Sequence, residues 1–423
     1  MDLKTGFIEP PELDKRLGML VYVTKSPPVI GRIKESFEDF HVEEVIDLKI
    51  VNSRLDKGYA VYLMEKRCMD TFSAVAKTAK LLDVPVNAVG YAGLKDTVAV
   101  TRQYITVPVE ELKTLIENVK DKKLSLSFIG FSNKKLKPGC LVGNKFKVAV
   151  SLKGGEELDK VVNALRELSE LSGIPGFYGY QRFGVRRPNT HVVGRFIVKR
   201  LWDEALREIV GHPYPWESPR SYEARVLFEE GSLQEALEKF PKALFYERLI
   251  IKRLLEGWAP LKILRRLPSN LRLLYVSGYQ SYLFNLALSR RLVETDLNPT
   301  RILEGDIVRG VRDEGMVREG SSILYMVTPG VGRLFEKLKG DSGRIIKHVM
   351  VEEDVKPEDF KIDKLNVVCK ASPREVFMKF RYLDLTVQQS SKPFLSFMLP
   401  QGGYATILLR EILKQDPLKA NFR

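Results

Sequence analysis

Residues 90–103 combine a lone carboxylate with cations and glycines in a pattern that can support nucleophilic chemistry. Asp96 follows a turn bounded by two glycines and is flanked by Lys95 and Arg102. Glycine lets the backbone turn tightly and approach a ligand closely. A carboxylate held among cations is expected to stay ionised at neutral pH, which makes it a poor proton carrier but a usable nucleophile. The alternative is a loop aspartate that caps a turn beside a hairpin, and local chemistry alone favours that alternative.

A second segment, residues 176–184, is dense in aromatic side chains and glycines and also contains a glutamine and an arginine. Tyr178 and Phe183 offer stacking faces, and Gln181 and Arg182 offer hydrogen bonds, as unpaired nucleic-acid bases require. An aromatic hairpin in a hydrophobic core is the other interpretation. Because glycines leave a core poorly filled, we favour a binding site here.

The overall charge and the cysteine usage restrict the class of protein. The 423 residues include 68 Lys and Arg against 54 Asp and Glu, a formal charge of +14, which favours polyanionic partners such as nucleic acid. The three cysteines are far apart, so we expect neither a disulfide framework nor a zinc site, in keeping with a reducing cytoplasm. Residues 1–4 lack the apolar stretch of a signal peptide, and no apolar segment is long enough to span a bilayer.

Periodic patterns predict the elements that position these residues. Alternation predicts strands over 30–46, 59–66 and 104–107. Helical spacing predicts helices over 71–82, 109–118, 157–172 and 277–293, the first of them capped by Asp70 or Thr71 with Phe72 on its apolar face. The basic stretch 134–150 fits a solvated hairpin and a phosphate-binding strip equally well.

The length and the change in character along the chain predict two domains. Residues 186–380 are rich in expected helices and basic side chains, whereas the last forty residues return to a compact strand, turn and helix. We therefore expect residues 1–185 and 381–423 to form one discontinuous domain, with residues 186–380 as an insertion.

Five blocks in order resemble the TruD family of tRNA pseudouridine synthases, in an archaeal-looking form and over nearly the whole chain. They are Lys34 with Glu38-Asp39-Phe40 and Val42-Glu43-Glu44; Gly90 to Gln103; Gly179 to Gly184; Tyr279 to Asn285; and Leu399 to Glu411. One block alone would be a weak signal, but five in order and at similar distances are a specific one.

The resemblance implies an α+β fold. It would be a pseudouridine-synthase core with a mixed, mainly antiparallel sheet and flanking helices, interrupted by an α/β insertion (TRUD) domain. The implied activity is the isomerisation of uridine to pseudouridine in tRNA, by family habit at position 13, after the base is flipped out of its stem. No cofactor and no metal are implied, and the expected form is a cytoplasmic monomer.

The resemblance also implies residue roles. Asp96 would be the catalytic nucleophile, Lys34 a lysine close to it and Glu38 an acidic partner in the active-site network. Tyr178 occupies an aromatic position beside the target base. The other candidate substrate contacts are Gln181, Arg182, Phe183, Lys95 and Arg102.

Two positions depart from the family pattern. Gly176 stands where the family often has asparagine, so this chain offers no side-chain amide here for a base contact or for the network around Asp96. Thr97 stands where many members carry a basic residue. Neither departure removes the expected nucleophile.

Two other functions compete. A metal-dependent nuclease or phosphatase would gather a cation with Asp96, Glu38, Asp39, Glu43 and Glu44. Strand alternation sends residues 38 and 39 to opposite faces, and the four histidines are scattered, so we do not expect a metal site. The second alternative is a non-catalytic RNA-binding or chaperone protein in which Asp96 is only structural.

Overall fold

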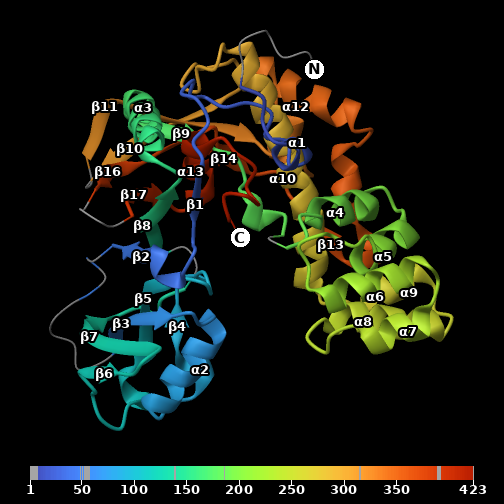
Figure 1. The fold of residues 1–423 in the computed structure, drawn as a ribbon, viewed down its shortest axis with the longest axis horizontal. Helices are drawn as coiled ribbons and strands as arrows, with labels where there is room; N and C mark the ends of the chain where they lie inside the picture. Colours follow the sequence, from blue (N-terminus) through green and yellow to red (C-terminus); the bar gives the residue numbers. More distant parts are fainter. Residues whose placement is uncertain are drawn as a thin grey trace. The chain divides into compact units, whose positions relative to one another are not determined.

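The computed structural model describes residues 8–47, 49, 51, 58–137, 140–184, 186–313, 316–387 and 392–422. The chain folds into two compact units (Figure 1). The first, here called the sheet unit, comprises Thr24–Ile174 and Met378–Phe422. The second, the helical unit, comprises the segment up to Val23 and Pro175–Phe377. The N-terminal residues 1–4, in which we expect no signal peptide, lie outside the described residues.

The sheet unit is built on one mixed sheet of ten strands in the order β16-β17-β8-β2-β5-β3-β7-β6, with β1 beside β8 and β4 beside β5. Only β2 and β5 pair in parallel, and the other neighbours among the described residues are antiparallel. The predicted mixed, mainly antiparallel sheet is therefore confirmed. The strands are β1 Gly31–Ile33, β2 Phe40–Ile46, β3 Tyr59–Arg67, β4 Gly90–Tyr91, β5 Val100–Pro108, β6 Asn118–Lys120, β7 Leu124–Ser132, β8 Leu141–Leu152, β16 Arg381–Thr386 and β17 Phe394–Pro400.

Alternation along the strands sets which side chains enter the core. The predicted strand 59–66 is confirmed as β3, whose Ala60, Tyr62 and Met64 are buried together. The predicted strand 30–46 is instead interrupted, because the 3₁₀ turn η1 (Phe37–Asp39) separates β1 from β2. Beyond that turn, β2 alternates regularly between buried and half-buried side chains.

The helix α2 (Thr71–Leu81) packs against the strands β3, β5 and β7 (Figure 1). Its N-cap is Asp70, whose side chain accepts a hydrogen bond from the Ser73 backbone N–H, as predicted. The predicted apolar face was wrong at Phe72, whose side chain is 63% exposed. The buried face is set by Ala74, Val75 and Ala79 instead.

The remaining helices of the sheet unit agree only in part with the periodic patterns. The predicted helix 157–172 is confirmed as α3 (Gly155–Leu171), which ends at Ser172 in the left-handed conformation. The closing helix is α13 (Ala405–Leu413), which packs against α3. The predicted helix 109–118 was wrong. A single 3₁₀ turn, η4 (Val109–Glu111), is followed by non-helical chain whose Leu112 and Ile116 pack on the core. A further 3₁₀ turn, η3, spans Val86–Ala88.

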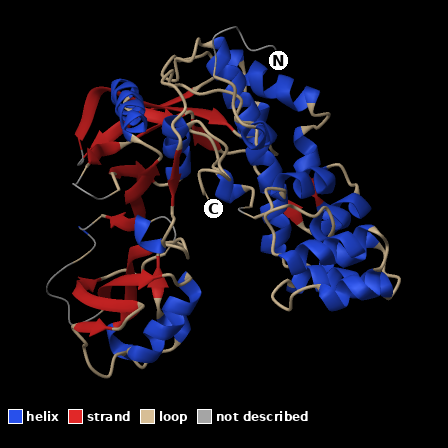
Figure 2. Cartoon of the chain, in the orientation of Figure 1, coloured by secondary structure: helices blue, strands red, loops and turns tan. Residues whose placement is uncertain are grey.

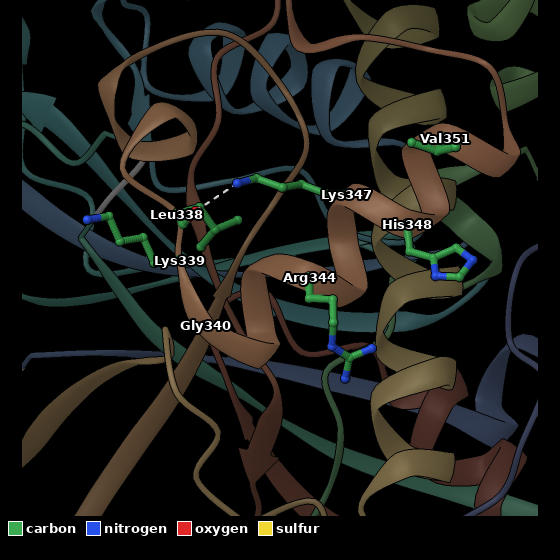
Figure 3. A pocket seen from close by; sticks show the side chains of 7 residues that line it. All are labelled: Leu338, Lys339, Gly340, Arg344, Lys347, His348 and Val351. Atoms are coloured by element: carbon green, nitrogen blue, oxygen red, sulfur yellow. Dashed lines mark hydrogen bonds between the residues drawn. The ribbon is translucent and has the colours of Figure 1, made fainter.

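The helical unit is organised around the 26-residue helix α10 (Ser269–Glu294), which packs against α4 and α12 (Figure 2). This helix begins at Ser269, before the predicted start at 277. Pro268 stands directly before it and disfavours the α conformation in the residue that precedes it, so the helix starts after the proline. The other helices and 3₁₀ turns are α1 Glu12–Arg16, η5 Tyr180–Arg182, α4 Thr190–Val198, α5 Trp202–Val210, α6 Pro219–Glu229, α7 Leu233–Lys239, α8 Phe245–Leu255, α9 Pro260–Arg266, α11 Arg333–Glu336, α12 Gly340–Glu352, η6 Pro357–Phe360 and η7 Asp363–Leu365.

Short strands complete the helical unit. The strands β10 (Ile307–Asp313), β11 (Met316–Val327) and β14 (Pro373–Glu375) form one antiparallel sheet, and β12 (Lys361–Ile362) pairs with β13 (Val367–Val368). The strands β9 (Gly173–Pro175) and β15 (Phe377–Lys379) lie where the chain passes from one unit to the other. The expected domain boundaries at 185/186 and 380/381 remain a prediction. Among the helices the structure describes, none combines the length and the apolar character needed to cross a membrane.

Candidate active site

The Asp96 turn connects two antiparallel neighbours in the sheet unit, β4 and β5. At Gly90 a Cβ atom would lie 2.5 Å from the Thr106 hydroxyl oxygen, so only glycine lets β4 approach β5 this closely. Asp96 is half-buried and lies in the connecting loop, at residues 92–99. Asp96 therefore keeps part of its surface exposed while its loop is held at both ends by the sheet.

Two side chains from neighbouring elements, Lys66 and Thr71, hold the loop backbone. The ammonium of Lys66, on β3, donates to the Asp96 carbonyl oxygen at 2.7 Å and to the Met69 carbonyl oxygen at 2.7 Å. The Thr71 hydroxyl, at the start of α2, accepts from the Lys95 N–H at 3.0 Å. Hydrogen bonds from both sides fix the position of the residue that carries the candidate nucleophile.

Lys34 lies in the short segment between β1 and η1 and adopts the left-handed conformation, with φ of 52°. The Asn421 side-chain amide donates to the Lys34 carbonyl oxygen at 2.9 Å. The Lys34 Nζ lies 4.0 Å from the centroid of the Phe40 ring, and the residue is only 8% exposed. The structure thus places this lysine in the protein interior with its ammonium on an aromatic face.

Two lysines bring positive charge to Asp96. Burial lowers the pKa of Lys34 below its ordinary value, and the charge of Asp96 opposes this change. Burial also lowers the pKa of Lys66 to about 8, again opposed by Asp96 and by Asp70. The candidate nucleophile and the candidate lysine are therefore in electrostatic contact, together with a lysine that sequence reasoning missed.

A signal for Lys66 was present in the sequence. The alternation along β3 buries Ala60, Tyr62 and Met64, and continuing that period by two residues reaches Lys66. A lysine in the buried phase of a strand needs partners inside the protein, which makes it a candidate for a structural or catalytic role.

The acidic residues near β2 divide into exposed and paired groups. Glu38, the expected acidic partner of the network, is exposed on η1. Its neighbour Asp39 is buried and accepts from the Ser36 N–H at 2.9 Å and from the Lys392 ammonium at 3.0 Å. Glu44 is buried 2.8 Å from the ammonium of Lys95. We expected Lys95 to contact the substrate, but in this structure its ammonium forms an ion pair with the buried carboxylate of Glu44.

Arg102 is on the half-exposed face of the same sheet. Its guanidinium pairs with Glu65 at 2.8 Å and with Glu43 at 3.7 Å. It lines a cavity of about 520 Å³ to which Lys145 and Lys147 also contribute. The basic stretch 134–150, whose role the sequence left open, therefore places part of its positive charge in a hollow of the sheet.

The aromatic block 176–184 lies in the helical unit. The Tyr178 ring carries the Arg374 guanidinium 3.6 Å from its centroid and contacts Phe284 edge-on at 5.7 Å. The side-chain amide of Asn285 both accepts from the Tyr178 N–H at 2.8 Å and donates to the Tyr178 carbonyl oxygen at 3.1 Å. Tyr178 is half-buried, so the residue keeps part of its surface exposed.

The other residues of this block differ in exposure. Gln181 is exposed, and Arg182 is half-buried with its Nε donating to the Ser281 hydroxyl at 3.0 Å. Phe183 has no exposed surface and packs edge-on against His191, so it contributes to packing in this conformation.

The departure at Gly176 has a steric cause. A Cβ atom at this position would lie 1.8 Å from the Glu375 carbonyl oxygen. The Gly176 N–H donates to Val376, and the Gly176 carbonyl oxygen accepts from the Arg374 guanidinium. An asparagine does not fit this backbone, so the chain uses glycine where the family often has an amide side chain.

Metal-ligating residues do not gather in the part of the chain that the structure describes. Across residues 8–422, outside the gaps given above, no group of three or more His, Cys, Asp or Glu side chains is arranged to hold a metal ion. Three of the five carboxylates of the rival interpretation are engaged by cations instead: Asp39 by Lys392, Glu43 by Arg102 and Glu44 by Lys95.

Comparison with known proteins gives a consistent result. The family model of tRNA pseudouridine synthase D (TruD) matches residues 16–412. A protein of Saccharolobus solfataricus named probable tRNA pseudouridine synthase D is 32% identical over 97% of this chain and 99% of its own length. A protein of the same name from Thermococcus onnurineus is 34% identical over 93% of this chain and 97% of its own length.

A solved structure agrees with the sequence relatives. The crystal structure of a protein assigned as tRNA pseudouridine synthase D from Methanosarcina mazei matches with a TM-score of 0.79 at 29% identity. The match covers 97% of this chain and 100% of the other. With the ordered sequence blocks and the mixed sheet described above, these matches show that the chain belongs to the tRNA pseudouridine synthase D (TruD) family.

Proposed function

We propose that this protein converts uridine to pseudouridine in tRNA, with Asp96 as the nucleophile. The observation that supports this most directly is the environment of Asp96. Asp96 is partly exposed, its loop is held by Lys66 and Thr71, and the charges of Lys34 and Lys66 act on its carboxylate. Such an arrangement places positive charge beside a carboxylate on a loop of fixed position, as a nucleophile requires.

The reaction is an isomerisation within one nucleotide. The bond from uracil N1 to ribose C1′ breaks, the uracil turns, and a bond from C5 to the same C1′ forms. The proton lost from C5 balances the proton gained at N1. Asp96 attacks C1′, adds to the uracil ring or assists loss of the ribose 2′ proton. Each of these routes needs an ionised carboxylate but no redox partner, so the proposal includes no cofactor.

The target base has to leave its stem before Asp96 can act on it. Extruding a paired nucleotide costs a few kcal/mol, and aromatic stacking with the extruded base offsets this cost. We propose uridine 13 as the target, following the family habit, and Tyr178 as the stacking partner. Asn285 holds the Tyr178 backbone, and Arg374 and Phe284 contact its ring, which supports this role.

Two assignments remain. We propose that the enzyme is a monomer and that it acts in the cytoplasm. All three cysteines, Cys68, Cys140 and Cys369, are free, which suits a reducing compartment.

The substitution Asp96→Asn tests the proposal, because it removes the nucleophile and keeps the size of the side chain. We expect the wild-type protein to modify an unmodified tRNA transcript, as detected by carbodiimide mapping of pseudouridine. The variant should bind the transcript with unchanged Kd and form no pseudouridine. Measurable turnover by the variant would refute the nucleophile role. If the wild-type protein binds tRNA without modifying it, the non-catalytic alternative is correct.

A further inference from the structure

A cluster of basic side chains surrounds one tryptophan in the helical unit. Between residues 245 and 272 the chain has seven Lys and Arg against two Glu. This segment forms α8, α9 and the first turn of α10, and α8 packs on α9 (Figure 1). The cluster, here called the Trp258 patch, consists of Arg253, Trp258, Lys262, Arg265, Arg266 and Arg272.

The Trp258 ring holds three of these cations in place. The Lys262 Nζ lies 3.9 Å from the ring centroid, and the guanidinium carbons of Arg253 and Arg266 lie at 4.5 and 5.4 Å. A cation–π contact orients a cation without neutralising its charge, unlike an ion pair with a carboxylate. Lys262 and Arg266 therefore keep their full charge at defined positions on an exposed surface.

Most of the positive charge of the patch has no acidic partner. Within the described residues, no ion pair joins Lys262, Arg265, Arg266 or Arg272 to a carboxylate, and only Arg253 pairs with one, Glu256. Elsewhere in this unit exposed arginines such as Arg207 do pair with glutamates. A single surface cation is usually only solvated by water. Here the Trp258 ring holds Arg253, Lys262 and Arg266 close to one another.

Mutual repulsion adds to this imbalance. Arg272 is only 8% exposed, and its Nε has no hydrogen-bond partner within the described part of the chain. Burial lowers the pKa of Arg272, and the positive charge of Arg265 lowers it further. Arg265 itself donates to the Lys364 carbonyl oxygen at 2.7 Å. An anion bound here would relieve this repulsion and satisfy the buried guanidinium.

We propose that the Trp258 patch binds phosphates of the RNA backbone, as a contact surface made of residues other than those assigned to catalysis or base stacking. Several cations at fixed positions can each contact a different phosphate of an RNA backbone, whereas a single small anion could contact only some of them. The proposal rests on the proposed function, because it takes RNA as the substrate. The role of the Trp258 patch is to contribute affinity and to orient the RNA, not to take part in the chemical step.

The double substitution Lys262→Gln/Arg266→Gln tests the patch in the full-length protein. The probe is an unmodified tRNA transcript, whose Kd is measured at several salt concentrations. Removing two phosphate contacts should reduce the slope of log Kd against log salt by about 2. Between about 50 and about 200 mM salt, the wild-type protein should then lose roughly 10-fold more affinity than the variant. KM should rise, while kcat at saturating tRNA should stay unchanged.

The matched control is Lys242→Gln/Lys337→Gln, which also removes two exposed positive charges from this unit but lies outside the patch. A smaller change of slope in the control supports the proposal, and an equal change in both double variants overturns it. An unchanged slope in the patch variant also overturns it and leaves an acidic protein as the alternative partner. Because the test measures binding, it separates failure of the patch from failure of catalysis, which the wild-type turnover assay reports.

Discussion

At the scale of single residues, two lysines with different surroundings act on the Asp96 carboxylate. Lys34 has its ammonium on the Phe40 ring, whereas Lys66 binds the backbone of Asp96 itself. Lys34 thus contributes mainly charge and Lys66 contributes both charge and position. The two contributions can be separated by substitution.

Replacing Lys34 by methionine should lower kcat far more than it weakens tRNA binding. The substitution removes a positive charge acting on Asp96 and keeps an unbranched apolar side chain against Phe40. Losing one electrostatic contact of this kind costs roughly 10²–10³-fold in rate. Single-turnover rates and Kd for tRNA measure the two effects separately. The control is Lys153→Met on the exposed surface, and equal losses of rate and affinity in Lys34→Met would mean that the lysine contacts phosphate.

Lys66 gives a prediction for the dependence of stability on pH. Its pKa is about 8 in the folded protein and about 10.5 when the chain is unfolded. Between these values the unfolded chain binds more protons at this site, so the contribution of Lys66 to stability increases as pH rises from 8 towards 10.5. Urea midpoints of the wild type and Lys66→Met, measured from pH 7 to pH 10, should therefore shift relatively in favour of the wild type. If the difference between the two urea midpoints stayed constant over this pH range, the lowered pKa of Lys66 would be wrong.

Single residues also show where sequence reasoning reached its limit. The spacing within residues 90–103 was enough to propose Asp96 as the nucleophile and to predict its glycine turn, because both features are local. Whether Glu38 or Asp39 is buried depends on the 3₁₀ turn η1, which interrupts the expected strand. The partner of Asp39 is Lys392, far away in sequence and brought close by the fold. Such long-range pairs follow from strand order, which local patterns do not contain.

At the scale of elements, α2 links the core to the Asp96 loop. Its first residue, Thr71, accepts from the Lys95 N–H, and its buried face packs on the sheet. The periodic pattern predicted the existence and the cap of this helix correctly. The pattern failed at 109–118, where apolar residues at helical spacing pack on the core without forming a helix. Spacing alone does not show whether a segment packs on the core as a helix or as irregular chain.

Thr71→Val should lower kcat by roughly 10-fold with a small loss of stability, about 1 kcal/mol, because the Lys95 N–H loses its acceptor and the loop that carries Asp96 becomes less ordered. The matched control is Thr78→Val on the same helix. Thr78 is also buried, but its hydroxyl contacts only the Met64 sulfur among the bonds described. Steady-state kinetics and urea denaturation of both variants check the prediction. If both variants lose rate equally, the effect comes from the helix as a whole and not from the hydrogen bond to the loop.

At the scale of the whole molecule, the mixed, mainly antiparallel sheet is the feature that the family resemblance predicted and the structure confirms. The closing strand β17 pairs with β8 over seven residues, which brings the C-terminal segment into the sheet formed by the first part of the chain. Sequence composition showed that the middle of the chain differs from its ends. Composition could not show that Tyr178 is held by Arg374, because that contact spans almost 200 residues.

The distribution of carboxylates over the whole molecule predicts a metal-independent reaction. Three acidic residues near the candidate site, Asp39, Glu43 and Glu44, are paired with cations, and a metal ion would have to displace an ammonium or guanidinium to reach them. We therefore expect the initial rate of pseudouridine formation to be unchanged when EDTA is added.

Because EDTA also removes the Mg²⁺ that stabilises folded tRNA, the assay needs a control for the substrate. Monovalent salt or a polyamine should keep the melting temperature of the tRNA constant with and without EDTA. Under these conditions an unchanged rate fits a reaction carried by Asp96 and two lysines. A rate that falls at constant tRNA melting temperature, and returns only with a divalent cation, would show that a metal ion displaces the lysines or the arginine from the paired carboxylates. Asp96 would then act as a ligand rather than as the nucleophile.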